Sequence, residues 1–418
     1  MKLFARCILF MRYFTGSLPL YFNMRRLGRR RRINPGYRTP NRIRLVRGGK
    51  PYFDQLLEMI NRARDIIQLQ VYIYDNDETG QEVTKALIAA ARRNVRVYLM
   101  ADGYASQHLS KGFIHEMADA GIHFRFFEPL FRSRKSYFGR RLHHKIIIVD
   151  NRFAMAGGIN ISNHYNDRPE KTAWLDFALF MEGEIVKDLC PICQKIWIGY
   201  LPAEEESFCA GNQAVFDIRP EEACELRVRR NDWVMKRNQV SRSYVEMFRK
   251  ANNHIMMMSG YFMPGRVIRK NMKKAVRRGV KIKLILAGIS DVRIAKFAER
   301  FMYGWLFKNS IEIYEYKPCV LHGKVAVYDR QWATIGSYNV NDISAYASIE
   351  LNIDINNPAF AEKLTDTMEK IIREDCVQIT SENYHLRSGI FSKIWERICY
   401  WLVRLLFYIF TFNFKQKG

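Results

Sequence analysis

Two short stretches of this 418-residue chain carry the same polar side chains in the same order. In each stretch a His is followed by a Lys two positions later and by an Asp seven positions later, and then by a Gly turn and an Asn. Every one of these residues in the first stretch recurs 179 positions later. The sets are His143, Lys145, Asp150, Gly157 and Asn160, and His322, Lys324, Asp329, Gly336 and Asn339.

These side chains suit the transfer of a phosphodiester group. Two Lys ammoniums and two Asn amides, from Asn160 and Asn339, can hold the non-bridging oxygens of a phosphate without a metal ion. One imidazole can attack phosphorus while the other protonates the leaving alkoxide. A single stretch could not fill both roles, which accounts for the duplication. Neither stretch has His or Cys at metal-ligand spacing, so we predict no metal site.

An attacking imidazole must be neutral, and its second ring nitrogen must be held in place. Two carboxylates are candidates for this task. Asp176 lies 33 residues after His143, and Glu350 lies 28 residues after His322. We expect Asp176 and Glu350 to orient the histidines that they follow.

The sequence around the two stretches alternates between strand and helix patterns. The first series has helices at 51–65 and 80–93, strands at 66–74 and 95–101, and short apolar runs at 145–149, 153–156 and 177–181. The second has helices at 241–252 and 267–278, strands at 254–261 and 281–287, and runs at 325–328, 332–335 and 349–355. The order is the same, which predicts an α/β protein with two similar domains.

The paired motifs resemble those of the phospholipase D superfamily, over roughly residues 45–375. Within it the chain is most similar to bacterial cardiolipin synthases, notably at 102–106, 140–141, 261–264 and 313–318. The resemblance implies two phospholipase D-like α/β/α domains about a pseudo-twofold, a phosphatidyl-histidine intermediate, and no cofactor or metal. It implies that the His, Lys and Asp of both motifs are catalytic. Neither the residues nor the resemblance says which histidine is the nucleophile.

The implied reaction moves a phosphatidyl group from one phosphatidylglycerol to another and releases glycerol. Alternatives are another phosphatidyltransferase, a lipid hydrolase or a nuclease of the same superfamily, and a non-catalytic scaffold, which two intact motifs disfavour. Aromatic, apolar ends disfavour the nuclease, so the expected partners are anionic phospholipids, phosphatidylglycerol and cardiolipin, and a membrane surface rather than nucleic acid. Donor, acceptor and oligomeric state stay open.

Charge and apolar residues concentrate at the two ends of the chain. Residues 1–50 hold fourteen Lys and Arg and no acid, more than half of the net charge of +25, which is typical of an arm on an anionic bilayer. A transit peptide is the alternative. The apolar run 398–414 is interrupted by Arg404 and is short for a span, so we expect an interfacial helix, or else a core-packed one.

We therefore predict an amphipathic arm at 1–47, domains at 48–200 and 241–385, a linker at 201–240 and a membrane-associated segment at 386–418. Many cardiolipin synthases begin with two spanning helices, which this chain lacks. The expected location is the cell membrane, peripheral or monotopic, on the cytoplasmic face.

Three further features allow two interpretations each. The stretch with Phe297, Phe301, Met302, Trp305, Leu306 and Phe307 is an interfacial helix or core. The basic residues Arg132, Arg134, Lys135, Arg140 and Arg141 collect anionic headgroups or form a solvated loop. The eight Cys are expected to be reduced thiols of a cytosol-facing protein, with Cys190 and Cys193 as packed helix residues rather than a zinc or redox pair.

Overall fold

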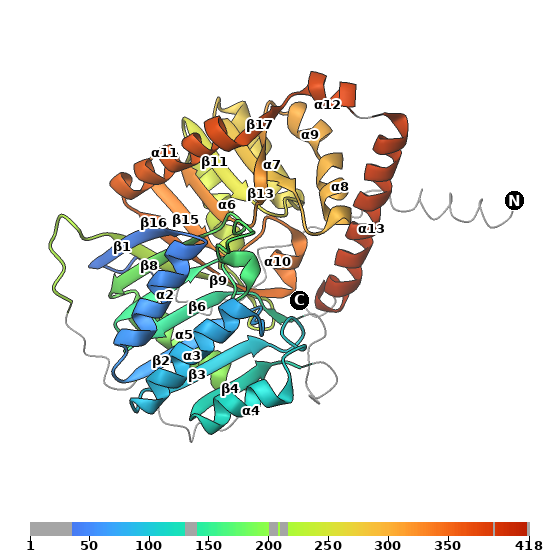
Figure 1. The fold of residues 1–418 in the computed structure, drawn as a ribbon. Coiled ribbons are helices and arrows are strands. Elements are labelled where there is room, and N and C mark those ends of the chain that lie inside the picture. Colours follow the sequence, from blue (N-terminus) through green and yellow to red (C-terminus); the bar gives the residue numbers. More distant parts are fainter. Residues whose placement is uncertain (1–35, 130–139, 200–207, 210–215, 388, 416–418) are drawn as a thin grey trace, which may run out of the picture. The chain divides into compact units, whose positions relative to one another are not determined.

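The computed structural model describes residues 36–129, 140–199, 208–209, 216–387 and 389–415, and a compact unit begins at Tyr37 (Figure 1). Most of the predicted arm therefore lies outside the described residues. Its last residues form a strand of the first sheet, β1 (Asn41–Arg47). The predicted domain boundaries stay predictions, although the segment expected to be a linker contributes two strands to the second sheet, β9 (Glu225–Asp232) and β10 (Arg237–Asn238).

The first sheet has seven strands. Its order is β1, β8 (Phe177–Gly183), β7 (Phe153–Gly157), β6 (Lys145–Val149), β2 (Ile66–Val71), β3 (Arg96–Asp102) and β4 (Ile122–Phe127). Strands β2, β3 and β4 are parallel, and the other neighbours pair antiparallel. The accompanying helices are α2 (Lys50–Arg62), α3 (Glu78–Arg92), α4 (Lys111–Asp119), α5 (Val186–Ile198) and the short η1 (Asn163–Tyr165).

The second sheet repeats this order. It runs β10 (Arg237–Asn238), β9, β16 (Ser348–Asn356), β15 (Trp332–Gly336), β14 (Lys324–Tyr328), β11 (His254–Ser259), β12 (Lys281–Ile289), β13 (Glu312–Val320) and β17 (Cys376–Ile379), with β5 (Arg141–Leu142) pairing β16. The helices are α6 (Gln239–Lys250), α7 (Arg266–Arg277), α8 (Arg293–Phe301), α9 (Tyr303–Phe307), α10 (Asp342–Tyr346), α11 (Pro358–Asp375), α12 (Ser381–Arg387) and α13 (Ile390–Lys415). The predicted α/β architecture with two similar domains is confirmed.

Alternating side chains of the central strands divide the core into layers. In β6, Ile146 and Ile148 belong to a cluster shared by both sheets, together with α5 and α11. Ile147 and Val149 point the other way, into the cluster that α2 and α3 cover. The second sheet has a matching outer cluster under α6 and α7. Because the shared cluster joins the two domains, their facing edges are fixed relative to one another.

Asp and Asn side chains cap the N-termini of α3 and α11. The Asp77 side chain accepts a hydrogen bond from the Gly80 amide at the start of α3. Asn357 does the same for the Phe360 amide of α11, and Pro358 fills the first helical position.

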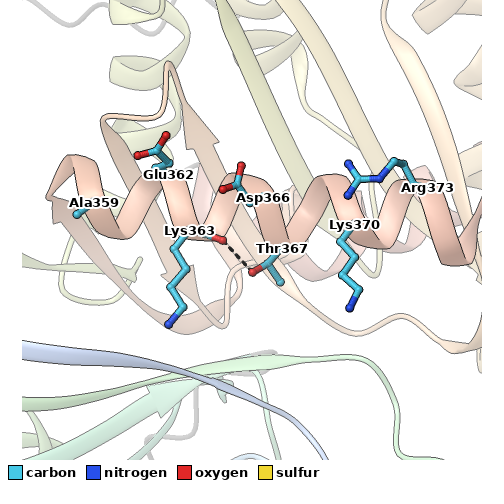
Figure 2. Close-up of a pocket in the computed structure, with 7 residues that line it drawn as sticks. All are labelled: Ala359, Glu362, Lys363, Asp366, Thr367, Lys370 and Arg373. Carbon is cyan, nitrogen blue, oxygen red and sulfur yellow. Dashed lines mark hydrogen bonds between the residues drawn. The ribbon is translucent and has the colours of Figure 1, made fainter.

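A shallow surface depression runs along α11 (Figure 2). All of its lining residues come from that helix, so it contains no part of the repeated motifs. They are Ala359, Glu362, Lys363, Asp366, Thr367, Lys370 and Arg373.

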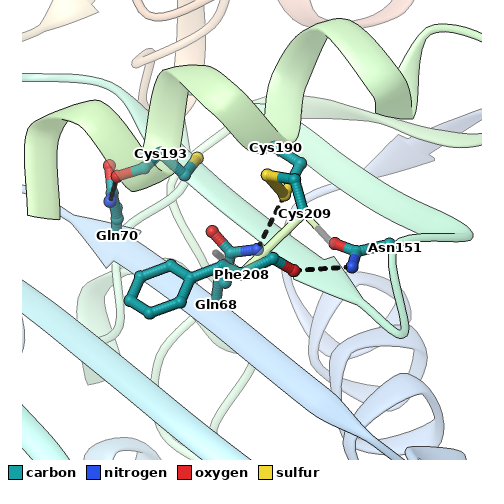
Figure 3. The surroundings of a disulfide bond; sticks show 7 residues. All are labelled: Gln68, Gln70, Asn151, Cys190, Cys193, Phe208 and Cys209. Carbon is teal, nitrogen blue, oxygen red and sulfur yellow. Dashed lines mark hydrogen bonds between the residues drawn. A yellow bond between two sulfur atoms is a disulfide. The ribbon is translucent and has the colours of Figure 1, made fainter. Parts of the chain in front are cut away.

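Two cysteines form a disulfide, Cys190 of α5 and Cys209, as Figure 3 shows. The prediction that every Cys is a reduced thiol is therefore wrong for this pair. A sequence without partner information could not place Cys209 beside α5. Cys193 is a free, buried helix residue, as expected, and burial raises its pKa to about 12.

Helix α13 packs along α8 (Figure 1). Tyr400, Val403 and Phe407 of α13 are buried against Met302 and Met263. The stretch 297–307 is therefore core: Phe297, Phe301 and Trp305 pack against this cluster, and Leu306 of α9 is buried in the outer cluster of the second sheet. No helix among the described residues is long and apolar enough to cross a bilayer.

Candidate active site

The two motif histidines lie where the domains meet. Strand β5 pairs with β16 of the other domain, and the amide of His143 donates to the carbonyl of Ile349 over 3.1 Å. The second motif has an equivalent contact. Leu321 forms a parallel β-bridge with Leu175, and the amide of His322 donates to the carbonyl of Leu175 over 2.8 Å. Each histidine is thus held beside the start of a strand of the opposite domain, β16 for His143 and β8 for His322.

The carboxylates pair with these histidines crosswise. Nδ1 of His143 lies 2.9 Å from Oε2 of Glu350, and Nδ1 of His322 lies 2.6 Å from Oδ2 of Asp176. Both predicted orienting residues reach a histidine, but each reaches the one in the other half of the chain. The expectation that each would serve the histidine it follows is wrong, because the interdomain bridges place each histidine beside the other domain's carboxylate.

The second residue of each Gly turn shapes the pocket of its carboxylate. Ser337 donates its hydroxyl to the same Oε2 of Glu350 that faces His143. The equivalent position in the first domain is Gly158, where a Cβ would come within 2.4 Å of the Asp176 carboxylate. Both carboxylates are fully buried. In the first domain, the absence of a side chain at Gly158 leaves room for the Asp176 carboxylate. In the second domain, the Ser337 hydroxyl forms a hydrogen bond with the Glu350 carboxylate.

Both motif lysines are buried beside the histidines. Nζ of Lys145 donates to the carbonyl of His143 over 2.6 Å, and Nζ of Lys324 donates to the carbonyl of His322. Loss of hydration lowers the pKa of Lys145 to about 7 and that of Lys324 to about 8, against the attraction of Glu350 and Asp176. An anionic phosphate between the two ammoniums would favour their charged forms.

Burial also lowers the pKa of both imidazoles and raises the pKa of Asp176 to about 6. A neutral imidazole that donates its Nδ1 proton to a carboxylate keeps a lone pair on Nε2. This is the protonation state that nucleophilic attack or proton abstraction requires.

Asn160 acts through a tyrosine that sequence reasoning missed. Its Nδ2 donates to the hydroxyl of Tyr165 over 2.9 Å, and its Oδ1 accepts from the Ile73 amide. The Tyr165 hydroxyl lies 3.4 Å from Nε2 of His322. The amide of Asn160 is therefore engaged with protein, whereas Oδ1 of Asn339 is buried without a partner among the described residues. The sequence offered no local signal for Tyr165, because only the fold brings its hydroxyl beside a histidine of the other domain.

A second tyrosine lines the site from the end of β2. The ring of Tyr72 meets His143 edge-on with centroids 4.9 Å apart, and Nζ of Lys145 lies 5.1 Å from the same ring. Because parallel strands end at one edge of a sheet, a Tyr directly after a buried strand was a usable signal.

The motif aspartates do not join the histidines. Asp150 accepts from the backbone amides of Arg64, Asp65 and Ile66, at the far end of β6. Five strand residues at about 3.3 Å each separate it from His143. Asp329 accepts from the amides of residues 252–254 in the same way. Both residues have a positive φ, near 50°. This placement indicates a structural role: each carboxylate accepts hydrogen bonds from the backbone where the neighbouring strand begins, β2 for Asp150 and β11 for Asp329.

The basic stretch before the first motif is only partly described. Arg132, Arg134 and Lys135 lie outside the described residues. Arg140 is buried in ion pairs with Glu128 and Asp232, and Arg141 pairs with Asp102. Arg140 and Arg141 are therefore engaged in ion pairs within the protein, and neither predicted role, binding lipid headgroups or forming a solvated loop, fits them. No group of three or more His, Cys, Asp or Glu in the described residues could hold a metal ion.

Comparison with known proteins identifies a family whose match covers both repeated motifs. Residues 56–176 and 244–372 match the family described as cardiolipin synthase, PLD-like domain. The chain is 35% identical over 347 residues to cardiolipin synthase B of Salmonella typhi, covering 82% of this chain and 83% of that protein. It is 34% identical over 349 residues to cardiolipin synthase B of Escherichia coli strain K12, with the same coverage.

A solved structure shares the fold. The phosphatidylserine synthase of Haemophilus influenzae Rd KW20 matches with a TM-score of 0.68 and 13% identity, over 89% of this chain and 96% of that one. The repeated motifs, the duplicated sheet order and the family match lead to one conclusion: the chain belongs to the phospholipase D-like cardiolipin synthase family of phosphatidyltransferases.

Proposed function

We propose that this protein makes cardiolipin from two phosphatidylglycerol molecules and releases glycerol. The observation that carries the proposal is the pair of imidazoles, one buried and one largely buried, each held by a carboxylate of the other domain and each beside a buried lysine. This set can bind one phosphodiester and serve it with a nucleophile and an acid.

The reaction has two displacements at phosphorus. In the first, Nε2 of one neutral imidazole forms a bond to phosphorus, and the bond from phosphorus to the glycerol oxygen breaks. The other imidazole, which carries a second proton on Nε2 because the bound anionic phosphate favours its charged form, donates that proton to the departing glycerol. In the second, a hydroxyl of another phosphatidylglycerol attacks phosphorus and gives its proton to that imidazole. The bond from phosphorus to nitrogen then breaks, which restores both histidines.

The surroundings of the histidines support different roles for them. The Tyr165 hydroxyl lies against Nε2 of His322, whereas Nε2 of His143 has no hydrogen-bond partner in the part of the chain that the structure describes. An unengaged lone pair favours attack on phosphorus. We therefore assign the nucleophile to His143 and general acid and base catalysis to His322.

The lysines and asparagines supply the phosphate-binding groups. Lys145 and Lys324 would neutralise the phosphate oxygens, with Asn339 as a neighbouring amide and Asn160 acting through Tyr165.

The site also restricts the access of solvent. The His143 and His322 side chains are 15% and 7% exposed. Such burial limits access of water and favours a lipid hydroxyl as acceptor.

The substrates require contact with a membrane. We propose that the protein is peripheral or monotopic at the cell membrane, with anionic phospholipids as its partners.

The test is to incubate the full chain with labelled phosphatidylglycerol in mixed micelles with a chelator, and to separate the lipids. We expect cardiolipin and free glycerol from the wild type and from His115→Ala, an exposed control on α4. His143→Ala and His322→Ala should make neither. Phosphatidic acid as the sole lipid product would identify a hydrolase instead. Turnover that resists both substitutions would remove the histidines from the mechanism.

A further inference from the structure

Helix α13 has an apolar face that its packing leaves uncovered. Its inner face, with Cys399, Tyr400, Val403 and Phe407, is buried against α8. On the outer side Phe391 is 88% exposed, Ile398 49% and Leu405 53%. A contiguous exposed apolar surface on a folded protein marks an interaction site. The exposed large side chains of α13 are Phe391, Ile394, Trp395, Ile398, Trp401, Leu402, Leu405, Leu406 and Tyr408.

Basic residues border this outer face along one side. At 100° per residue, Lys393, Arg397 and Arg404 lie between the outer face and the buried face of the helix. Trp395 and Trp401 are about half exposed on the outer face. Apolar side chains, Trp rings and a basic flank on one helix match the headgroup region of an anionic bilayer. A second copy of this basic chain would not supply the complementary charge.

The same helix adjoins segments that lead into the active site. Met263 follows β11, the strand of the second sheet that corresponds to β2, and is buried in the cluster that holds Val403 and Phe407. The amide of Met263 donates to the carbonyl of Val340, the residue after Asn339. Arg404 pairs with Asp342 at the start of α10, over 3.2 Å. Membrane contact along α13 would therefore act beside the loops of the second motif.

We propose that the outer face of α13 seats in the headgroup region of an anionic bilayer and presents the active site to membrane phosphatidylglycerol. The inference rests on the proposed function only for the identity of the lipid. The occupant is a lipid surface, since the apolar face and its basic flank match both parts of an anionic interface.

Quenching of tryptophan fluorescence can report on this helix, because Trp395 and Trp401 are about half exposed and the five other Trp of the chain are buried or partly buried. Residues 1–35 contain no Trp, so binding through that arm would bring none of its own into the bilayer. The full chain is mixed with vesicles of phosphatidylglycerol and brominated phosphatidylcholine, in which bromine quenches Trp at the interface. We expect quenching in the wild type and its loss in Trp395→Phe/Trp401→Phe, with vesicle binding retained. Unquenched wild type on vesicles that it binds would overturn the proposal.

A charge placed on the outer face gives the second measurement. Ile398→Glu/Leu405→Glu should bind these vesicles at least about tenfold more weakly. Val377→Glu, an exposed apolar position on β17, is the matched control and should bind like the wild type. Because the two altered side chains are half exposed, the fold should persist, which circular dichroism and the thermal midpoint check. Unchanged vesicle binding of the double variant would also overturn the proposal.

Three further outcomes distinguish membrane docking from a direct effect on catalysis, from failure of the proposed function and from a contact between two copies of the chain. Short-chain phosphatidylglycerol below its micelle concentration needs no docking, so the double variant should turn it over like the wild type. Equal loss on short-chain lipid and vesicles would contradict a docking role. Failure of the wild type to make cardiolipin from either form would overturn the proposed function while leaving quenching as the test of docking. If sedimentation shows a dimer that the double variant breaks, the face is a contact between copies, and the proposal fails.

Discussion

Nδ1 of His143 lies 2.9 Å from Oε2 of Glu350, 207 positions away in the chain and in the other domain. The reciprocal pair, His322 with Asp176, spans 146 positions. Neither domain therefore holds an oriented imidazole by itself. The interdomain strand pairing of β5 with β16 is what creates the contact. This explains why two similar domains must pack together before either histidine is held for catalysis.

Removing the negative charge of Glu350 or Asp176 should slow catalysis, because the histidine that each one orients, His143 or His322, loses its hydrogen-bond acceptor. Glu350→Gln and Asp176→Asn keep the shape but stabilise the wrong imidazole tautomer, so we expect kcat to fall by about 10²–10⁴-fold in each. Glu362→Gln, an exposed position on α11, is the control. Steady-state kinetics on micellar phosphatidylglycerol measure the effect. A loss in only one variant would mean that a single histidine needs orientation.

The assignment of the two histidines can be tested with a leaving group that needs no proton. On phosphatidyl-p-nitrophenol, His322→Ala should release p-nitrophenol in a burst of about one equivalent, because the first step no longer needs an acid. The second step still lacks its base, so the phosphatidyl-histidine intermediate should accumulate. His143→Ala should give no burst. The opposite pattern would exchange the two roles.

The sequence predicted the repeated elements well because apolar periodicity and the duplicated order are local signals. The strand predicted at 145–149 is β6, and that at 349–355 lies within β16. It also selected Asp176 and Glu350, but it paired them wrongly, since the pairing depends on strand contacts between domains. Tyr165 was missed because its role arises only where Asn160 and a histidine of the other domain converge.

The buried charge of Lys145 should cost stability. Its folded-state pKa of about 7 lies below the ordinary value of 10.5, so between these values the unfolded chain binds more protons and stability rises with pH. Lys145→Met removes the buried charge. We expect the variant to be inactive and about 1–4 kcal/mol more stable at pH 7, with a smaller gain at pH 9.5.

Urea unfolding at both pH values measures this gain, with Lys370→Met on the exposed face of α11 as the control. A variant less stable than the wild type at pH 7 would show that the ammonium is well solvated or paired in the free protein.

The disulfide between Cys190 and Cys209 closes a loop with a sequence separation of 19, which stabilises a folded chain by about 3 kcal/mol. Dithiothreitol should lower the thermal midpoint of the wild type, and Cys209→Ala should have that lower midpoint with or without reductant. Cys376→Ala, which alters a free thiol, should behave like the wild type. A midpoint of the wild type that ignores the reductant would contradict a stabilising bond.

The motif aspartates should matter for stability rather than for the chemical step. Asp329→Ala leaves three backbone amides, those of residues 252–254, without their acceptor, and the partly buried one should contribute most of a loss of about 1–3 kcal/mol. Because Asp329 lies at the far end of β14 from His322, kcat per folded molecule should change less than about threefold, in contrast to the Glu350→Gln variant. Active-site titration with a phosphatidyl-p-nitrophenol burst counts the folded molecules, and urea unfolding gives the stability. A large fall in kcat at wild-type stability would place this carboxylate in the catalytic machinery after all.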